Sequence, residues 1–274
     1  MRIKYDSKEE MLAIFSNKFI PEVAIISPIV IEHIVENTGE NINIKTDLGG
    51  SGFKVGYFLK TLKHYPVFFS FLGNDEYFNF IINSFDEKNI PLTWSVSPGK
   101  NPKKIRIIDE NKTYFQKSSS LNSISPLFLE EFLLNIKNVI ISLENWNKDI
   151  IELICYMVKN VYLNIRYNDF LEIKNSSVDY IFVDAFENNI DFNILNDINC
   201  KKIFTFTNKK IYFNKTIIFE IIDGIYFEEA MYAFESVFLS GLLRKFSEEY
   251  SLNLALKAFK ETQVNGNFNS ASYL

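Results

Sequence analysis

The chain is poor in the residue types that build disulfide frameworks and histidine metal sites. Its 274 residues include only two cysteines and two histidines. Cys155 and Cys200 are far apart in the sequence, so they provide neither a disulfide framework nor the spacing of a metal site, as is usual in a reducing compartment. His33 and His64 are too few for a histidine-based metal site. We therefore expect no metal site built from cysteine or histidine.

Long hydrophobic runs and clusters of positive charge are also missing. The formal net charge is −5, and no run of Lys and Arg provides a local surface for nucleic acid. Pro21, Glu22, Pro28 and Glu32 interrupt the most hydrophobic early segment before it reaches membrane-spanning length. The N-terminus lacks the layout of a signal peptide. We expect a cytoplasmic protein without a nucleic-acid or membrane partner.

What the chain does contain is enough apolar sequence for a large core. Hydrophobic residues make up 47% of it, which suits one large domain. From Ser125 onward, strand and helix patterns alternate, as in a parallel sheet flanked by helices. The predicted strands are 139–143, 161–165, 180–183 and 203–206, and the predicted helices lie near 126–136, 148–159 and 191–197.

The N-terminal third has a different pattern. Ser7 and Glu10 form a capping box ahead of apolar residues at helical spacing, so residues 1–22 are predicted to form a helical extension before a first strand at Val23–Ile26. Residues 42–48 and 91–117 are predicted to contain further strands, the latter with a polar turn between them.

Segment 223–243 carries the most specific pattern. Asp223 ends an apolar strand, and a long apolar helix follows immediately. Such a junction commonly binds phosphate, because backbone N–H groups and the helix dipole point there. The segment resembles the signature of the ribokinase (PfkB) family of sugar and nucleoside kinases, Asp-Thr-Thr-Gly-Ala-Gly-Asp-Ala-Phe followed by an apolar helix. One register places Glu229 at the family's general base, and a second places Ser236 there.

Neither register retains the glycines of the signature. In the family, the Gly-Ala-Gly amides form an anion hole for the transferring phosphoryl group. Their positions are taken here by residues 226–228, Tyr-Phe-Glu, or by residues 233–235, Ala-Phe-Glu. Both replacements add bulk and negative charge where phosphate would lie, because an anion hole requires small residues whose N–H groups converge.

Other segments extend the resemblance to the substrate side. Glu32 corresponds to the family's sugar-binding Asp, although a surface carboxylate on a turn is the alternative. Gly49 and Gly50 correspond to the paired glycines that let backbone approach substrate. Lys54 replaces a sugar-binding Asn, which favours an anionic ligand, a salt bridge to Glu32, or no ligand.

On the nucleotide side, residues 184–187 resemble the family's Asn-x-x-Glu, which organises Mg²⁺ and phosphate. The resemblance thus implies ATP and Mg²⁺ as cofactors, with Asp184, Glu187 and Asp223 near them. The nucleotide turn expected near 205–210 lacks both of its glycines.

The resemblance implies a ribokinase-like α/β domain over residues 23–274, in which helices flank a central, mostly parallel sheet and a small β lid covers the substrate. It implies a homodimer through the lid strands. The hypothesis that we favour is a divergent member with lost or weak ATP-dependent phosphotransfer, which binds a small polyhydroxylated, sugar- or nucleoside-like ligand or a protein partner. The alternative is an active ATP-dependent kinase of a sugar, nucleoside or related hydroxyl compound.

Overall fold

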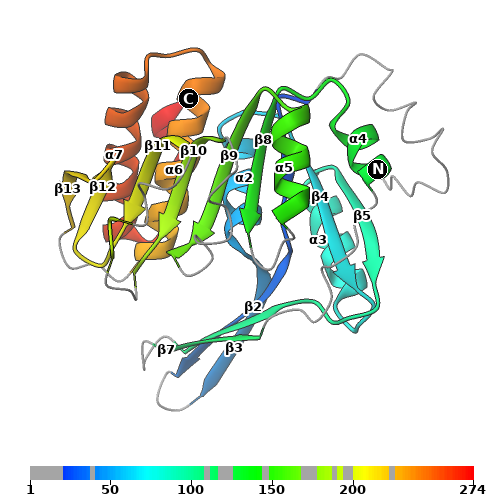
Figure 1. Ribbon diagram of the computed structural model, residues 1–274. Helices are drawn as coiled ribbons and strands as arrows, with labels where there is room; N and C mark the ends of the chain where they lie inside the picture. The colour runs from blue at the N-terminus through cyan, green and yellow to red at the C-terminus, as the bar shows by residue number, and fades with distance from the viewer. Residues whose placement is uncertain are drawn as a thin grey trace.

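The computed structural model describes residues 21–37, 41–107, 112–116, 126–143, 148–167, 178–186, 190–193, 200–221 and 226–274 (Figure 1). Of the predicted helical extension 1–22, residues 1–20 lie outside these ranges, and residues 21 and 22 are not helical. Glu187 and Asp223 also lie outside these ranges.

A large sheet forms the centre of the molecule. Its order over the described strands is β13-β12-β11-β10-β9-β8-β1-β4-β5. Pairing is parallel from β11 to β5 and antiparallel in β11-β12-β13. This confirms the predicted mostly parallel sheet. The bounds are β1 (Val23–Ile26), β4 (Pro66–Gly73), β5 (Leu92–Ser97), β8 (Asn138–Leu143), β9 (Asn160–Arg166), β10 (Val178–Asp184), β11 (Cys200–Phe206), β12 (Lys210–Phe213) and β13 (Thr216–Glu220).

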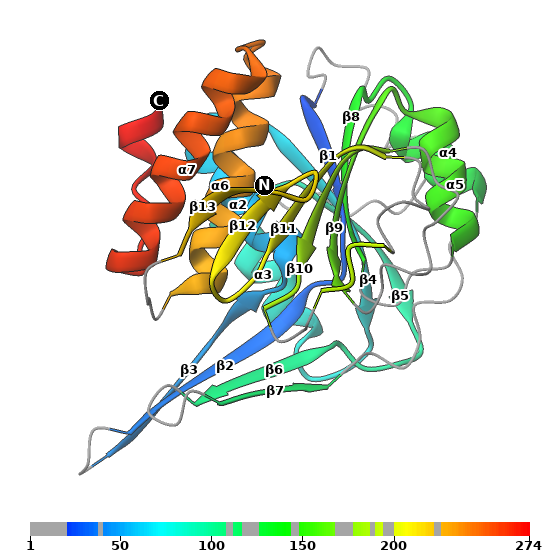
Figure 2. The ribbon, with the colours of Figure 1, turned by 60° about the vertical axis from the view of Figure 1, so that its left-hand side comes forward.

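Helices cover both faces of this sheet (Figure 2). One face packs against α2 (Ser51–Thr61), α3 (Phe78–Glu87), α6 (Phe227–Leu243) and α7 (Glu248–Asn265), and the other against α4 (Pro126–Leu133) and α5 (Lys148–Met157). The short helix η3 (Ser270–Tyr273) ends the chain. Because side chains alternate along a strand, Val161 and Leu163 of β9 pack toward α4 and α5, while Tyr162 packs toward α6.

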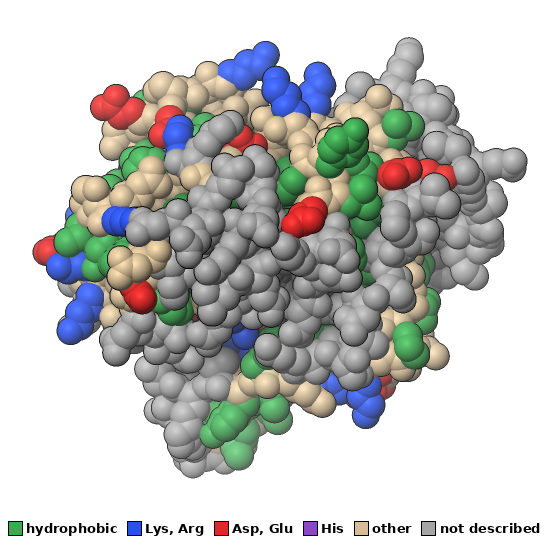
Figure 3. All heavy atoms as spheres, viewed as in Figure 1, with side chains coloured by type: hydrophobic (Ala, Val, Ile, Leu, Met, Phe, Trp, Pro, Cys, Tyr) green, Lys and Arg blue, Asp and Glu red, His purple; other side chains and the backbone are tan. Residues whose placement is uncertain are grey.

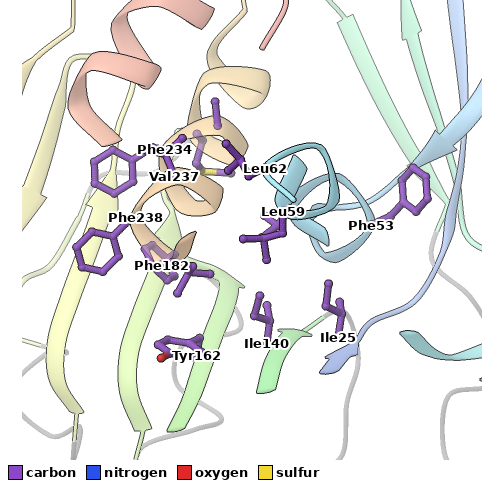
Figure 4. Packing of buried hydrophobic residues seen from close by; sticks show 14 of the residues in the cluster. Ile25, Phe53, Leu59, Leu62, Ile140, Tyr162, Phe182, Phe234, Val237 and Phe238 are labelled. Carbon is purple, nitrogen blue, oxygen red and sulfur yellow. The ribbon is translucent and has the colours of Figure 1, made fainter. Parts of the chain in front are cut away.

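Aromatic rings fill the layer between the sheet and α6 (Figure 4). The ring of Phe204 lies 5.2 Å from that of Phe234 and 5.0 Å from that of Phe238, both edge-on. On the side of α2, the buried His64 contacts Glu22 through Nδ1 at 2.7 Å and Ser240 through Nε2 at 2.8 Å. Burial lowers the pKa of His64, so the neutral ring, just after α2, links the residue before β1 to the last turn of α6.

A second, smaller sheet projects beyond the carboxyl end of β1 (Figure 1). Its order is β3-β2-β6-β7, with β2 (Val30–Asn37), β3 (Ile42–Gly49), β6 (Lys103–Ile107) and β7 (Lys112–Gln116). We call this sheet the lid. Strands β3, β6 and β7 lie where lid strands were expected, at about 42–48 and within 91–117, but Leu92–Ser97 does not join them. Leu92–Ser97 pairs in parallel with β4 in the large sheet, because β4, α3 and β5 form a βαβ unit. Strand β2, which was not expected in the lid, lies inside it between β3 and β6.

Candidate functional site

A pocket lies where the lid meets the carboxyl ends of β9 and β10 and the first turns of α2 and α6. Its cavity volume is about 30 Å³, and the hollow amounts to about 450 Å³ when the open solvent at its mouth is included. Ligands of α/β sheets commonly bind beyond the carboxyl ends of the strands. The pocket is lined by Val30, Gly50, Ser51, Lys104, Phe115, Asn164, Arg166, Asp184, Glu228, Met231 and Tyr232.

The paired glycines bring the lid close to the start of α2. Gly50 is the N-cap of α2 and has φ 90°, a left-handed conformation that favours glycine. Gly49 lies against Glu32 on the neighbouring strand, and a Cβ at this position would lie 3.1 Å from Glu32 Oε2. The glycine pair therefore makes room for the Glu32 carboxylate as well as for the turn into α2.

Glu32 is buried on β2, with 3% of its surface exposed. The structure thus excludes the alternative of a surface carboxylate on a turn. Three cations surround it: Arg106 Nη1 at 3.5 Å, Lys104 Nζ at 3.8 Å and Lys54 Nζ at 3.8 Å. Of the three roles considered for Lys54, the salt bridge to Glu32 is the one observed. Burying a carboxylate is costly unless it is paired, and these cations provide the pairing.

The same cations connect the lid to the first turn of α6. Lys104 Nζ donates to Glu228 Oε2 in a close pair, and Arg106 Nη1 donates to Glu229 Oε1 at 2.6 Å. Burial lowers the pKa of Arg106, but Glu229, Glu228 and Glu32 outweigh it and raise that pKa on balance. Burial would raise the pKa of Glu228, but Lys104 and Arg106 lower it on balance. Arg106 and Glu228 are therefore charged at neutral pH. We call Glu32, Lys54, Lys104, Arg106, Glu228 and Glu229 the lid–helix charge cluster.

The opposite wall of the pocket comes from the large sheet. Asp184 ends β10, and burial raises its pKa. Its Oδ1 accepts a hydrogen bond from the Phe186 amide at 3.2 Å. Arg166 ends β9, and its guanidinium lies 4.5 Å from the ring centre of Phe115 on the lid strand β7. This cation–π contact is a further link between the lid and the large sheet.

Deeper in α6, polar side chains face the core. Ser236 is fully buried, and its hydroxyl donates to the carbonyls of Tyr232 at 2.6 Å and Val55 at 3.2 Å. Glu235 has 1% of its surface exposed and accepts a hydrogen bond from Asn164 Nδ2 at 2.6 Å. Burial raises the pKa of Glu235 to about 8, so this side chain is mainly a neutral acid at pH 7.

The structure thus brings together most of the residues singled out from the sequence. Gly50 and Asp184 line the pocket, and Glu32, Lys54 and Glu229 belong to the adjoining charge cluster. Ser236 lies two turns into α6, below the pocket. Glu187 and Asp223 are outside the described residues.

Lys104, Arg166 and Tyr232 were not predicted to lie at the site. The feature of the sequence that could have indicated Lys104 and Arg166 is their spacing along a strand. Lys104 and Arg106 alternate on β6, and Asn164 and Arg166 alternate on β9, so each pair lies on one face of its strand. Which face meets the pocket depends on tertiary structure.

Comparisons with known proteins identify the fold. No family model and no curated protein matches the chain. Among solved structures, a microbiome-derived acarbose kinase matches with a TM-score of 0.76 at 12% identity, over 92% of this chain and 96% of that one. Phosphofructokinase-2 from Escherichia coli matches with a TM-score of 0.67 at 11% identity, over 89% and 94%. Ribokinase from Thermotoga maritima matches with a TM-score of 0.65 at 13% identity, over 93% and 96%.

These likenesses show that the chain has the ribokinase-like α/β fold. At such low identity they establish the fold alone. Within the described part of the chain, no helix combines the length and apolar character needed to cross a membrane. Over the same residues, no three His, Cys, Asp or Glu side chains are placed to hold a metal ion.

The lid–helix charge cluster leads to a stability prediction. Arg106→Met removes the partner of Glu229 and one of three cations around Glu32. Breaking a buried pair leaves an uncompensated charge, so we expect a loss of about 3 kcal/mol in the free energy of unfolding. Urea denaturation measures this loss.

The control is Lys103→Met on the same strand, because Lys103 pairs with the exposed Glu76. Exposed ion pairs contribute little to stability. The free energy of unfolding of this variant should therefore be far closer to that of the wild type than the free energy of Arg106→Met is. Equal losses in the two variants would contradict a structural role for the cluster.

Proposed function

We propose that this protein binds a small polyhydroxylated ligand in the lid pocket and has lost, or retains only weakly, ATP-dependent phosphoryl transfer. In this proposal it is a divergent ribokinase-like protein whose first α6 turn no longer receives a phosphoryl group. The pocket keeps its position between lid and sheet, but its charges are largely paired with one another.

The position of Glu228 is the observation that carries the proposal. Its carboxylate lines the pocket in the first turn of α6, where helix N–H groups would otherwise attract an anion. It already neutralises Lys104. At an effective dielectric of about 20, two like charges 4 Å apart repel by about 4 kcal/mol. A triphosphate would meet this repulsion in addition to competing for Lys104.

The remaining lining suits hydroxyl groups. Ser51, Asn164 and Tyr232 offer neutral donors and acceptors, and the Phe115 ring offers an apolar surface. Small-molecule pockets typically combine apolar surface with a few such polar groups. Polyhydroxylated compounds named for the similar structures, acarbose and fructose 6-phosphate, together with ribose, are suitable probes.

Glu229 favours a second candidate function, an active kinase of a sugar, nucleoside or related hydroxyl compound. It lies in the first turn of α6, and its buried Oε2 has no hydrogen-bond partner in the part of the chain that the structure describes. A general base needs such a lone pair. Mg²⁺ prefers carboxylates; of the two carboxyl groups that line the pocket in the described residues, Asp184 and Glu228, Glu228 is already paired with Lys104.

The proposed function leads to two predictions about the nucleotide, of which the first concerns turnover. With Mg²⁺ and ATP, the purified protein should release ADP at the background rate in the presence of acarbose, fructose 6-phosphate or ribose. Loss of an oxyanion-type donor costs about 10²–10³ in rate, and loss of a positioned base about 10²–10⁴. A coupled ADP assay measures the rate.

Robust turnover would overturn this proposal. If that turnover disappeared in Glu229→Gln and persisted in Ser236→Ala, the active-kinase candidate would replace it, with Glu229 as base. Binding of one probe without turnover, weakened in Glu32→Ala, would support the binding role.

The second prediction isolates Glu228. Glu228→Gln keeps the size of the side chain but frees Lys104 and removes the repulsive charge. The variant should gain stabilisation by Mg²⁺ and ATP in thermal unfolding, about 1.4 kcal/mol at a nucleotide concentration ten times Kd, whereas the wild type should show almost none.

The matched control is Glu249→Gln, which removes an exposed acid from the first turn of α7. It should behave like the wild type. No gain in Glu228→Gln, or an equal gain in Glu249→Gln, would show that Glu228 does not exclude the nucleotide.

The outer face of the lid supports a proposed homodimer. Along β6, Ile105 points away from the face that carries Lys104 and Arg106, and it pairs with Tyr114. Ile44 pairs with Val35, so it lies on the same outer face. Ile42, Ile44, Ile105 and Tyr114 are 67%, 66%, 40% and 54% exposed. Figure 3 shows hydrophobic side chains at the lower end of the view, where the lid projects. A largely uncharged apolar face can pair with itself across a two-fold axis.

We therefore expect a dimer by light scattering at micromolar concentration. Ile44→Asp should convert it to a monomer, because the charge would be buried in the interface. Ile217→Asp, at an exposed position on the sheet edge strand β13, is the control and should leave the dimer intact. A monomeric wild type would contradict the proposal of a homodimer.

A further inference from the structure

Asn164 connects the pocket to a buried acid that the proposed function does not use. It lies on β9 with 4% of its surface exposed, two residues before Arg166, and both residues line the pocket. Its Nδ2 donates to Glu235 Oε2 at 2.6 Å. Glu235 Oε1 is buried and has no hydrogen-bond partner among the residues that the structure describes. Such an arrangement is costly in a core, so it requires an explanation.

The neighbouring groups favour a neutral Glu235. Asp184 of β10 is the charged group that acts on it, and it disfavours a second negative charge. On α6 itself, Tyr232 lies one turn earlier with its pKa raised well above the ordinary value, so it stays protonated. On β8, Ser142 is the register partner of Asn164, and it contributes a hydroxyl that contacts Ser51. Among the residues that the structure describes, no cation contributes to the pKa of Glu235.

An asparagine amide has one acceptor and one donor end, and a fixed hydrogen bond at one end determines what the other end offers. One of the two Nδ2 hydrogens of Asn164 is committed to Glu235, which fixes the orientation of the amide. Its carbonyl oxygen then remains for the pocket. A neutral carboxylic acid or a Gln at position 235 can accept this hydrogen bond through its carbonyl oxygen, whereas an apolar side chain cannot.

We propose that Glu235 is a positioning residue that orients the Asn164 amide, so that Asn164 presents its carbonyl oxygen to the pocket and accepts a hydrogen bond from a ligand hydroxyl. This inference rests on the proposed binding function and adds a specificity-determining residue to it. It selects ligands that carry a hydroxyl donor at this position over ligands that offer only an acceptor.

The orientation depends on pH. When the pH rises through about 8, Glu235 loses its proton and becomes a buried charge with one hydrogen bond beside Asp184. A buried charge that is poorly paired drives local rearrangement or hydration. Asn164 then loses its fixed orientation, and the ligand loses its acceptor.

The ligand-free test follows the Asn164 side-chain amide by NMR, with its signal identified by its absence in Asn164→Asp. In the wild type this signal should shift between pH 6.5 and 9.5 with a midpoint of about 8. In Glu235→Gln it should not titrate. A constant wild-type signal, or the same titration in Glu235→Gln, would overturn the inference.

The binding test uses calorimetry with acarbose, fructose 6-phosphate and ribose. At pH 7, Glu235→Leu should weaken binding about tenfold, as expected for one lost hydrogen bond, while Glu235→Gln should restore affinity to within about twofold of the wild type. From pH 7 to pH 9 the wild-type affinity should fall several-fold more than that of Glu235→Gln. Because Asp184 is present in both proteins, this difference reports on Glu235.

The outcomes distinguish a failure of the proposed binding function from a failure of the positioning role of Glu235. If none of the three probes binds the wild type, the proposed binding function fails, and the amide titration still decides whether Glu235 positions Asn164. If a probe binds but Glu235→Leu and Glu235→Gln have equal affinity, the positioning role is wrong while the binding function stands. If Glu235→Leu does not fold, the difference in pH profile between the wild type and Glu235→Gln gives the decision.

Discussion

The buried carboxylate of Glu32 sets the main electrostatic constraint in this structure. The carboxylate of a residue that is only 3% exposed must be paired, and it draws Lys54 from α2 and Lys104 and Arg106 from β6 toward one point. Three cations around one carboxylate in turn need further acids. Glu228 and Glu229, in the first turn of α6, supply them. The position of the lid relative to the large sheet thus follows from charge neutralisation within the lid–helix charge cluster.

The same neutralisation limits what the pocket can bind. Phosphoryl transfer depends on positioned donors and cations more than on covalent participation of the protein. Here Lys104 is committed to Glu228, and Arg106 to Glu229. The cations that an anionic ligand would use are already paired within the chain, whereas the neutral hydroxyl and amide groups of the wall remain. Under the proposed function, the pocket is therefore suited to neutral polar ligands, while the fold that surrounds it is that of the similar structures.

Sequence patterns predicted the fold better than the site. Strand and helix alternation depends on local periodicity, so Val23–Ile26 and the core strands β8 to β11 lie where the pattern places them. Leu92–Ser97 has the local pattern of a strand, but whether a strand joins the lid or the large sheet depends on its neighbours. At the site, Lys54 and Glu32 were considered as a pair because the family resemblance placed both near substrate. The Lys104–Glu228 pair joins residues 124 positions apart, and no local pattern encodes such a partner.

In helix α6, the residues that face the pocket and the residues that pack against α7 lie at different ends of the same helix. It begins at Phe227, so Glu229 lies in its first turn and Ser236 two turns further on. The two registers of the family signature therefore describe two ends of one continuous helix. At the packing end, a Cβ on Gly241 would lie 2.3 Å from Ser251 Oγ, so the close contact of α6 with α7 requires a glycine there. At the pocket end, no comparable packing demand fixes the small residues of an anion hole, and glutamates that neutralise the lid cations occupy the first turn. A helix can therefore keep the residues that hold the fold together while, under the proposed function, its first turn forms internal ion pairs in place of a phosphate site.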